Sequence, residues 1–234
     1  MKFLKKFKTE QDLVITDTPS VYLIDATRKV GYVQGNLPVR IQHIDGSLYS
    51  ADEWFAGGFT NDKANGVVVL TEKGNILLAK EQYTCEWGGY YIEIAGLSRE
   101  FGSGESNTTK IINAIGDNGG VEYAALKASS YTFPDGNHGF LPSIDEWAAI
   151  APYIKLANSY LSTIGGKILN GSSSSNTVSW YASSYSDNDK YSADNTKLLF
   201  NFIHMDITIL QNAIDESRTT RSATCVVLPI RILD

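Results

Sequence analysis

The most informative stretch of this chain is Gly139-Phe140-Leu141-Pro142-Ser143-Ile144-Asp145-Glu146-Trp147. Leu141 and Pro142 predict an extended entry, and Ser143 is a favoured N-cap residue. Ser143 and Glu146 have the spacing of a capping box, and acidic residues in the first turn complement the helix dipole. The stretch therefore predicts a helix that begins after Ser143 and packs Trp147 inward.

Two further segments follow it, Ser179-Trp180-Tyr181-Ala182-Ser183-Ser184 and Arg221-Ser222-Ala223-Thr224-Cys225-Val226-Val227-Leu228-Pro229-Ile230-Arg231. The order of these three segments resembles the C-type lectin-like fold of formylglycine-generating-enzyme-like domains and of phage and bacterial variable ligand-binding proteins. The resemblance covers roughly residues 64–234 and implies an α+β fold. In that family the first and last strands pair, so we expect the segment from Val67 to Leu78 to lie beside the segment from Val226 to Ile232.

The chain departs from this family at the motifs that carry chemistry. True C-type lectins bind calcium through Glu-Pro-Asn and Trp-Asn-Asp motifs, and neither tripeptide occurs here. Formylglycine-generating enzymes rely on two closely placed cysteines near the C-terminus, where this chain has Cys225 alone. The resemblance therefore implies the fold without that activity.

The composition favours a globular protein with a polar, sparsely charged surface. Apolar residues make up 43% of the 234 residues and charged residues 20%, with 13 Tyr and 20 Gly. This balance is typical of a loop-rich binding protein, or simply of a β-rich fold. The net charge of −6 argues against nucleic acid as a partner, because phosphate binding needs a basic surface. No apolar run approaches the ~20 residues that span a bilayer, so we expect no membrane insertion.

The N-terminus carries the basic cluster of the chain, in which Phe3, Leu4 and Phe7 lie between four lysines. The polar run Thr9-Glu10-Gln11-Asp12 occupies the place where a signal peptide has its apolar region, so the sequence indicates no export signal. Three apolar residues cannot form a core of their own. We therefore expect Phe3, Leu4 and Phe7 to attach the chain to another virion protein or to a second copy of itself.

Residues 1–60 are predicted to form an N-terminal arm and a small β-rich attachment segment, and residues 61–234 the lectin-like domain. Alternating apolar residues and turns indicate a hairpin over residues 20–33. The arm and this hairpin together are similar to the start of virion and fibre-type proteins of phages that infect gut bacteria.

Periodicity and turn residues predict the other elements. Strands are expected over residues 39–44, 178–181 and 198–203, and a hairpin over residues 64–79. Helices are expected over residues 107–115, with a capping candidate at Asn107, over residues 121–128, and over residues 144–164, the last divided by Pro152. Cys85 and Cys225 lie far apart and have no Cys-x-x-Cys partner, so we expect reduced thiols rather than a zinc or redox site.

Enzyme motifs are absent from the sequence. It contains no Gly-x-Ser-x-Gly, no Gly-rich phosphate loop and no His-Glu-x-x-His. A carboxylate pair drawn from Glu86, Glu93, Glu100 and Glu105 is the one alternative, because a glycan-active enzyme needs two such groups. We expect a protein without enzymatic activity and without a cofactor.

Recognition is expected in three polar loops, residues 99–109, 170–177 and 184–196. The third supplies the candidate ligand-binding residues Tyr185, Asp187, Asn188, Asp189, Tyr191 and Asn195. Its Asp and Asn residues could also bind calcium, but such clusters more often form solvated turns, and we predict no metal. Trp87 and Tyr90 flank two glycines, where aromatic rings suit stacking on sugars or packing at a strand edge.

These observations favour a non-enzymatic bacteriophage virion structural protein, such as a head or tail fibre or a decoration component, with a lectin-like domain for receptor or glycan binding. It would lie on the surface of the virion and contact other virion proteins and a glycan or protein of the host. The alternative is a bacterial surface or variable-repertoire ligand-binding protein. The missing export signal favours the virion.

Overall fold

The computed structural model describes residues 22–23, 30–31, 38–89, 92, 94–169, 177–181, 183, 199–206, 214–220 and 224–233. The chain divides into a small unit, Met1–Pro38, and a large one, Val39–Asp234. In the small unit, β1 (Tyr22–Leu23) pairs antiparallel with β2 (Val30–Gly31), which confirms a hairpin within residues 20–33.

The large unit contains a five-stranded antiparallel sheet with the order β12-β6-β5-β3-β4. The central strand β5 carries the run Val67, Val68 and Val69, each with 0% of its surface exposed. Consecutive buried residues mean that both faces of the sheet are covered here, which is why this strand is apolar without alternation. The strands of this first sheet are β3 (Val39–His43), β4 (Leu48–Tyr49), β5 (Ala64–Thr71), β6 (Gly74–Leu78) and β12 (Ile230–Leu233).

The large unit begins at Val39, whereas the sequence predicted a boundary near residue 60. Strand β3 pairs with β5, opposing Ile41 to Val67, and so belongs to the same sheet. Helix α1 (Ala51–Ala56), which the sequence did not predict, contributes the buried Trp54 to the main core. Residues 39–60 are therefore part of the body of the protein.

A second sheet has the order β10-β9-β8-β11-β7, with a parallel pairing between β8 and β11 and antiparallel pairings elsewhere. The expected strands near residues 178 and 200 are present as β8 and β9. The strands of this second sheet are β7 (Tyr83–Glu86), β8 (Thr177–Tyr181), β9 (Leu199–Asp206), β10 (Ile214–Thr220) and β11 (Thr224–Val227).

Two neighbouring segments connect the sheets. Strand β6 continues toward β7, and β11 continues through Leu228 and Pro229 into β12, with the Ala79 N–H donating to the Pro229 carbonyl at 3.0 Å. The predicted closure is confirmed for β12, since Ile230 opposes Leu78 across the β6–β12 pair. It is wrong for Val226, which lies in β11 opposite Thr84, because Leu228-Pro229 carries the chain from one sheet to the other.

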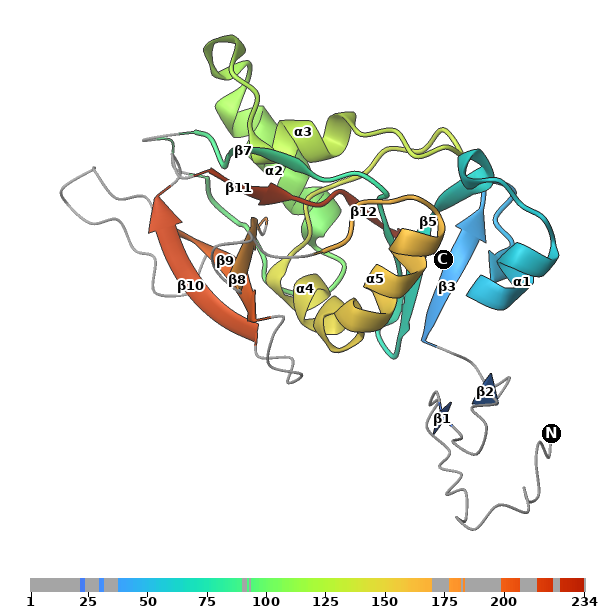
Figure 1. Cartoon of the computed structure of the whole chain (residues 1–234). Helices are drawn as coiled ribbons and strands as arrows, with labels where there is room; N and C mark the ends of the chain where they lie inside the picture. Colours follow the sequence, from blue (N-terminus) through green and yellow to red (C-terminus); the bar gives the residue numbers. More distant parts are fainter. Residues whose placement is uncertain are drawn as a thin grey trace. The chain divides into compact units, whose positions relative to one another are not determined.

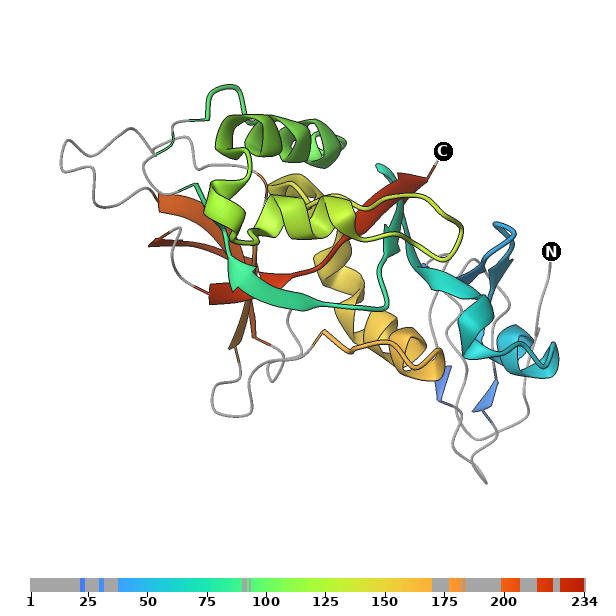
Figure 2. The same cartoon turned by 90° about the horizontal axis from the view of Figure 1, so that it is seen from above.

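Two groups of helices cover the sheets, and α4 contacts both sheets, through β5 in the first and β9 in the second (Figure 1). Helix α5 contacts β3 and β5, and α3 contacts β7 and β11. Figure 2 shows the green helices α2 and α3 side by side. These groups enclose two cores: the larger contains Trp54 and Trp147, the smaller Trp87 and Tyr123. The helices are α2 (Gly104–Ile115), α3 (Ala124–Ser130), α4 (Ile144–Ile150) and α5 (Ile154–Thr163), with short 3-10 turns at Asn61–Lys63, Asn118–Gly120 and Ala151–Tyr153.

The expected helices are present with shifted boundaries. The chain from residue 144 to 163 is divided at Pro152, as predicted, because proline cannot donate the helical hydrogen bond. Helix α2 begins at Gly104 rather than after Asn107. Asn107 lies inside α2 because its side chain bonds to a neighbouring loop instead of capping the helix. The molecule is thus a mixed α+β protein, as the sequence predicted.

Candidate functional site

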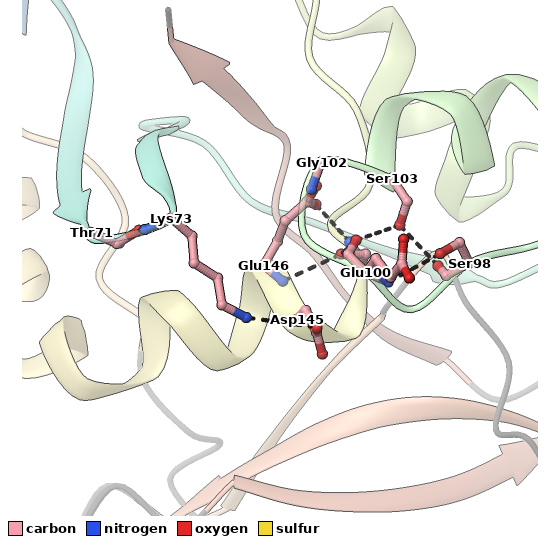
Figure 3. Close-up of polar contacts among 9 residues, drawn as sticks. Thr71, Lys73, Ser98, Glu100, Gly102, Ser103, Asp145 and Glu146 are labelled. Atoms are coloured by element: carbon pink, nitrogen blue, oxygen red, sulfur yellow. Dashed lines mark hydrogen bonds and ion pairs between the residues drawn. The ribbon is translucent and has the colours of Figure 1, made fainter.

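One carboxylate fastens the loop before α2 to the start of α4. Glu146 Oε1 accepts hydrogen bonds from the backbone N–H groups of Gly102, at 3.0 Å, and Gly104, at 3.1 Å. Glu146 Oε2 accepts the Ser143 N–H at 2.7 Å, and the Ser143 hydroxyl accepts the Glu146 N–H at 3.3 Å. Figure 3 shows Glu146 between α4 and the loop. The predicted capping box is confirmed, and its glutamate also holds residues 98–104.

Hydroxyl groups hold the carbonyl side of the same loop. The Ser143 hydroxyl donates to the Glu100 carbonyl at 2.9 Å, and the Ser103 hydroxyl donates to the Ser98 carbonyl at 3.0 Å (Figure 3). Gly104 is needed at the junction, because a Cβ there would collide with Glu146 Oε2. The backbone of the loop is therefore fixed by contacts on both its amide and its carbonyl side.

Glu146 itself is fully buried. Burial raises its pKa above the ordinary value of 4.5, although hydrogen bonds from the backbone of Ser143, Gly104 and Gly102 and from the Ser143 hydroxyl all lower it. Both oxygens accept backbone N–H groups and the side chain has no exposed surface, so the carboxyl group faces the backbone of the loop rather than solvent. Its role is to position the loop.

A buried amide joins this loop to a distant part of the chain. Asn107 Nδ2 donates to the Ser98 carbonyl at 2.6 Å and to the Ser183 hydroxyl at 3.2 Å, while Asn107 Oδ1 accepts the Ser98 N–H at 2.9 Å. The Ser183 N–H donates to the Pro142 carbonyl at 2.7 Å. Asn107 and Ser183 are both fully buried. Asn107, within the predicted recognition segment 99–109, is therefore bonded to Ser183, the last described residue before the predicted segment 184–196.

The solvent-facing groups around this junction are mostly acidic. Glu100 and Glu105 are exposed, and the Asp145 side chain is 39% exposed. Lys73 Nζ lies 3.8 Å from Asp145 Oδ2, an ion pair that solvent weakens (Figure 3). This part of the surface thus combines exposed carboxylates with a fixed backbone. The name "junction surface" denotes Ser98–Gly104 together with Asp145.

Trp87, one of the two aromatic residues predicted to stack on sugars, is buried. Trp87 has 0% of its surface accessible and belongs to the smaller core. Gly88 explains this packing, since it has a φ of +90° and a Cβ there would collide with the Cβ of Tyr123. The indole of Trp87 therefore packs in the core rather than on a ligand, which was the alternative interpretation of the sequence.

The other predicted binding residues lie outside the described residues. These are Tyr90, Tyr185, Asp187, Asn188, Asp189, Tyr191 and Asn195, together with the predicted attachment residues Phe3, Leu4 and Phe7. Of the carboxylates considered for a hydrolase, Glu93 also lies outside them, whereas Glu86, Glu100 and Glu105 are exposed.

The part of the chain that the structure describes contains neither a cluster of metal ligands nor a membrane-spanning helix. No group of three or more His, Cys, Asp or Glu side chains there is placed to hold a metal ion. None of the helices described is long and apolar enough to cross a membrane.

Sequence reasoning missed a second polar cluster, centred on Asp135. Arg231 Nη1 lies 2.7 Å from Asp135 Oδ2, and Asn65 Nδ2 donates to the same oxygen at 3.0 Å and to Gln42 Oε1 at 2.7 Å. Burial opposes the ionisation of Asp135, but hydrogen bonds from Asn137 and Arg231, with the Arg231 charge, hold its pKa below 3.8. No local motif predicts it, because its residues come from β3, β5, β12 and a turn.

The comparisons with known proteins concern the fold. No protein-family model matches the chain, and the comparison with curated proteins gives no match. Among solved structures, the chain is similar to a fimbrial protein from Bacteroides ovatus, with a TM-score of 0.51 and 10% sequence identity. The match covers 85% of this chain and 48% of that one, so the present chain spans about half the length of the fimbrial protein.

Proposed function

We propose that this chain is a non-enzymatic surface attachment protein that binds a host glycan or protein through the junction surface. The observation that carries the proposal is the Asn107 side chain, which bonds to both Ser98 and Ser183. It fixes the loop of residues 98–104 to Ser183, which in the sequence directly precedes the predicted recognition segment 184–196. Binding residues are commonly presented in this way, by loops on a rigid scaffold.

The polar network favours binding over catalysis. Glu146 has both oxygens occupied by backbone donors, so the most deeply buried carboxyl group of the junction positions a loop. A loop held in one conformation loses less entropy on binding, which supports recognition. The chain after Ser183 is rich in Tyr, Ser, Asn and Asp, the residue types of adaptable polar binding loops.

The location that we propose is a bacterial cell surface. The fold is similar to that of a fimbrial protein from Bacteroides ovatus, which supports a surface role for this chain too. The alternative is a bacteriophage virion, to which the small unit Met1–Pro38 would attach the body. In both cases we propose that residues 1–38 contact an assembly partner, either another structural protein or a second copy of the chain.

The finer architecture that we propose for residues 64–234 is the C-type lectin-like one. Its support is the pairing of β6 with β12 and the capped helix α4 with Trp147 buried beneath it. An experimental structure of the full chain would test this. Helices and strands that superpose on a C-type lectin-like domain in the same order would support it, and a different connectivity would reject it.

Ligand binding is tested on a glycan array and on intact host cells. Replacing residues 184–196 by a Gly-Ser loop of equal length should abolish binding, and the double variant Glu100→Ala, Asp145→Ala should weaken it. The matched control replaces Asp117 and Asn118 by Gly and Ser at the other end of α2, about 17 Å along a helix of this length. If the control and the junction variants bind equally, the junction surface is not the site.

Location is tested separately. Native cells that contain the chain would be treated with protease from outside, and purified phage particles from the same host would be analysed for the chain by mass spectrometry. Release of its peptides from intact cells supports the cell-surface role. Recovery in particles, with loss of recovery when residues 1–13 are deleted, supports the virion instead.

A further inference from the structure

The two cysteines of the chain, 140 positions apart, oppose each other in the second sheet. The register of β7 and β11 pairs Cys85 with Cys225, between the pairs Thr84 with Val226 and Glu86 with Thr224. The sequence alone indicated unconnected thiols. The fold instead makes them direct neighbours across an antiparallel ladder.

We propose that Cys85 and Cys225 form a disulfide between β7 and β11 when the protein reaches an oxidising environment. Opposed residues of an antiparallel pair have Cα atoms about 4.5–5.5 Å apart, and disulfides bridge Cα separations of about 4.4–6.8 Å. The backbone register therefore already provides the separation that the bond requires.

Cys85 lies on the inner face of β7, where its side chain is half-buried and remains partly accessible to solvent. Along β7, Tyr83 and Cys85 are half-buried whereas Thr84 and Glu86 are exposed, so the first two share the inner face. Cys85 packs against the smaller core, whose Val227 opposes Tyr83 in the same ladder. The Cys85 thiol is therefore accessible to a small oxidant, while its packing against the smaller core holds it in place.

A lysine of α3 lies over this face. Lys127 Nζ is 2.8 Å from a carboxylate oxygen of Glu122 and 5.0 Å from the centre of the Tyr83 ring. The pKa of Lys127 is raised, chiefly by the hydrogen bond to Glu122 and also by its interaction with Cys85. The thiol of Cys85 is half-buried, and we therefore assign it as the attacking group, because attack on a disulfide requires access to the oxidant.

The reaction needs a two-electron oxidant, for which oxidised glutathione serves. The Cys85 thiolate attacks one glutathione sulfur, which breaks the glutathione disulfide and releases one glutathione thiolate. The Cys225 thiolate then attacks Cys85 in the mixed disulfide, forming the Cys85–Cys225 bond and releasing the second glutathione. Both cysteines lose a proton, the protein loses two electrons and glutathione gains them.

This bond would join β7 to β11, next to the two segments that run from one sheet to the other. Strand β7 follows β6, and β11 leads into β12, so the bond ties the two segments that connect the sheets. It would also close a loop that contains α2 to α5 and the junction surface. The bond does not depend on what the junction binds.

The test uses the purified full chain, equilibrated with oxidised glutathione and then denatured in the presence of an alkylating reagent. Intact mass should show no alkylated cysteine, and non-reducing peptide mapping should show a peptide pair linked through Cys85 and Cys225. Reduction should lower the melting temperature by about 5–15 °C, the range expected for a disulfide in a chain of this size. Two alkylated cysteines in the oxidised, folded monomer would overturn the proposal.

A register control separates this pairing from simple thiol proximity. The double variant Cys225→Ser, Val226→Cys keeps two cysteines but moves one by a single position, which places it on the other face of the strand. Oxidised under the same conditions, it should retain two alkylatable thiols, and reduction should leave its melting temperature unchanged. Formation of an intramolecular disulfide in this variant as readily as in the natural chain would show that the register does not select the pair.

Discussion

The pentapeptides Ser50-Ala51-Asp52-Glu53-Trp54 and Ser143-Ile144-Asp145-Glu146-Trp147 share one pattern and form the same local structure. Each begins a helix with a capping box, and each places its tryptophan in the main core. The bonds are nearly identical: the serine N–H is 2.7 Å from the glutamate in both, and the return bond is 3.2 Å in α1 and 3.3 Å in α4.

The surroundings of the two glutamates differ, and so do their pKa shifts. Hydrogen bonds from the Ser50 backbone and hydroxyl lower the pKa of the exposed Glu53. Burial raises the pKa of Glu146, although that group accepts more hydrogen bonds. The motif therefore determines where a helix begins, whereas the packing around it determines the direction in which the pKa of the glutamate shifts and which other groups it binds.

The largest effect is expected from the tryptophan of α4. Trp147→Ala should lower the free energy of unfolding by about 3–5 kcal/mol, because it removes a fully buried indole from the main core. Urea denaturation measures this change. Phe55→Ala is the control, since Phe55 is 66% exposed and should change stability by less than about 0.5 kcal/mol. Near-native stability of the Trp147 variant would contradict the burial of α4.

Next in size is the contrast between the glutamates. Glu146→Ala should cost about 2–4 kcal/mol, because it leaves the N–H groups of the buried Ser143 and Gly104, and that of Gly102, without their acceptor. Glu53→Ala should cost about 0.5–1 kcal/mol, since solvent can replace its one bond to the backbone. Both values come from chemical denaturation. Equal costs would mean that the contacts of Glu146 to the loop contribute nothing.

The serines should repeat this contrast on a smaller scale. Ser143→Ala should cost about 1–2 kcal/mol, because the buried hydroxyl caps α4 and also donates to the Glu100 carbonyl. Ser50→Ala should cost about 0.5–1 kcal/mol, for the cap alone. Amide hydrogen exchange at Gly102 and Gly104 should increase in the first variant and not in the second. Unchanged exchange in both variants would show that the Ser143 hydroxyl does not stabilise the loop of residues 98–104.

The sequence predicted well those features that neighbouring residues determine. The capping box at Ser143, the break at Pro152 and the hairpin of β5 and β6 each follow from a few adjacent residues. The same capping-box spacing occurs at Ser50 and Glu53, and it would have predicted α1. The sequence placed the boundary between the two domains near residue 60. In the structure α1 and β3 connect residues 39–60 to the main core, so the large unit begins at Val39.

Features made by distant residues were beyond local reasoning. Asn107 was expected to cap a helix, yet it bonds to Ser98 and Ser183, a choice that only the packed structure determines. The pairing of Cys85 with Cys225 likewise follows from the register of two strands that are far apart in the chain. Trp87 could not be placed from its neighbours either, because a Trp-Gly-Gly sequence is compatible with an exposed and with a buried indole. In the structure the indole is buried.

The smallest expected effect is a difference in pH dependence between the two glutamates. Glu146 has a raised pKa in the folded state, so the fold binds its proton more tightly, and its contribution to stability falls as the pH rises above about 4.5. Glu53 has a lowered pKa, so it stabilises the fold above about 4.5 and loses this contribution as the pH falls. Unfolding free energies of the natural chain, Glu146→Gln and Glu53→Gln, measured between about pH 3 and pH 7, separate the two. The difference in unfolding free energy between the natural chain and Glu146→Gln should shrink as the pH rises toward neutral. The difference between the natural chain and Glu53→Gln should shrink as the pH falls. Slopes of the same sign would show that burial does not outweigh the hydrogen bonds of Glu146.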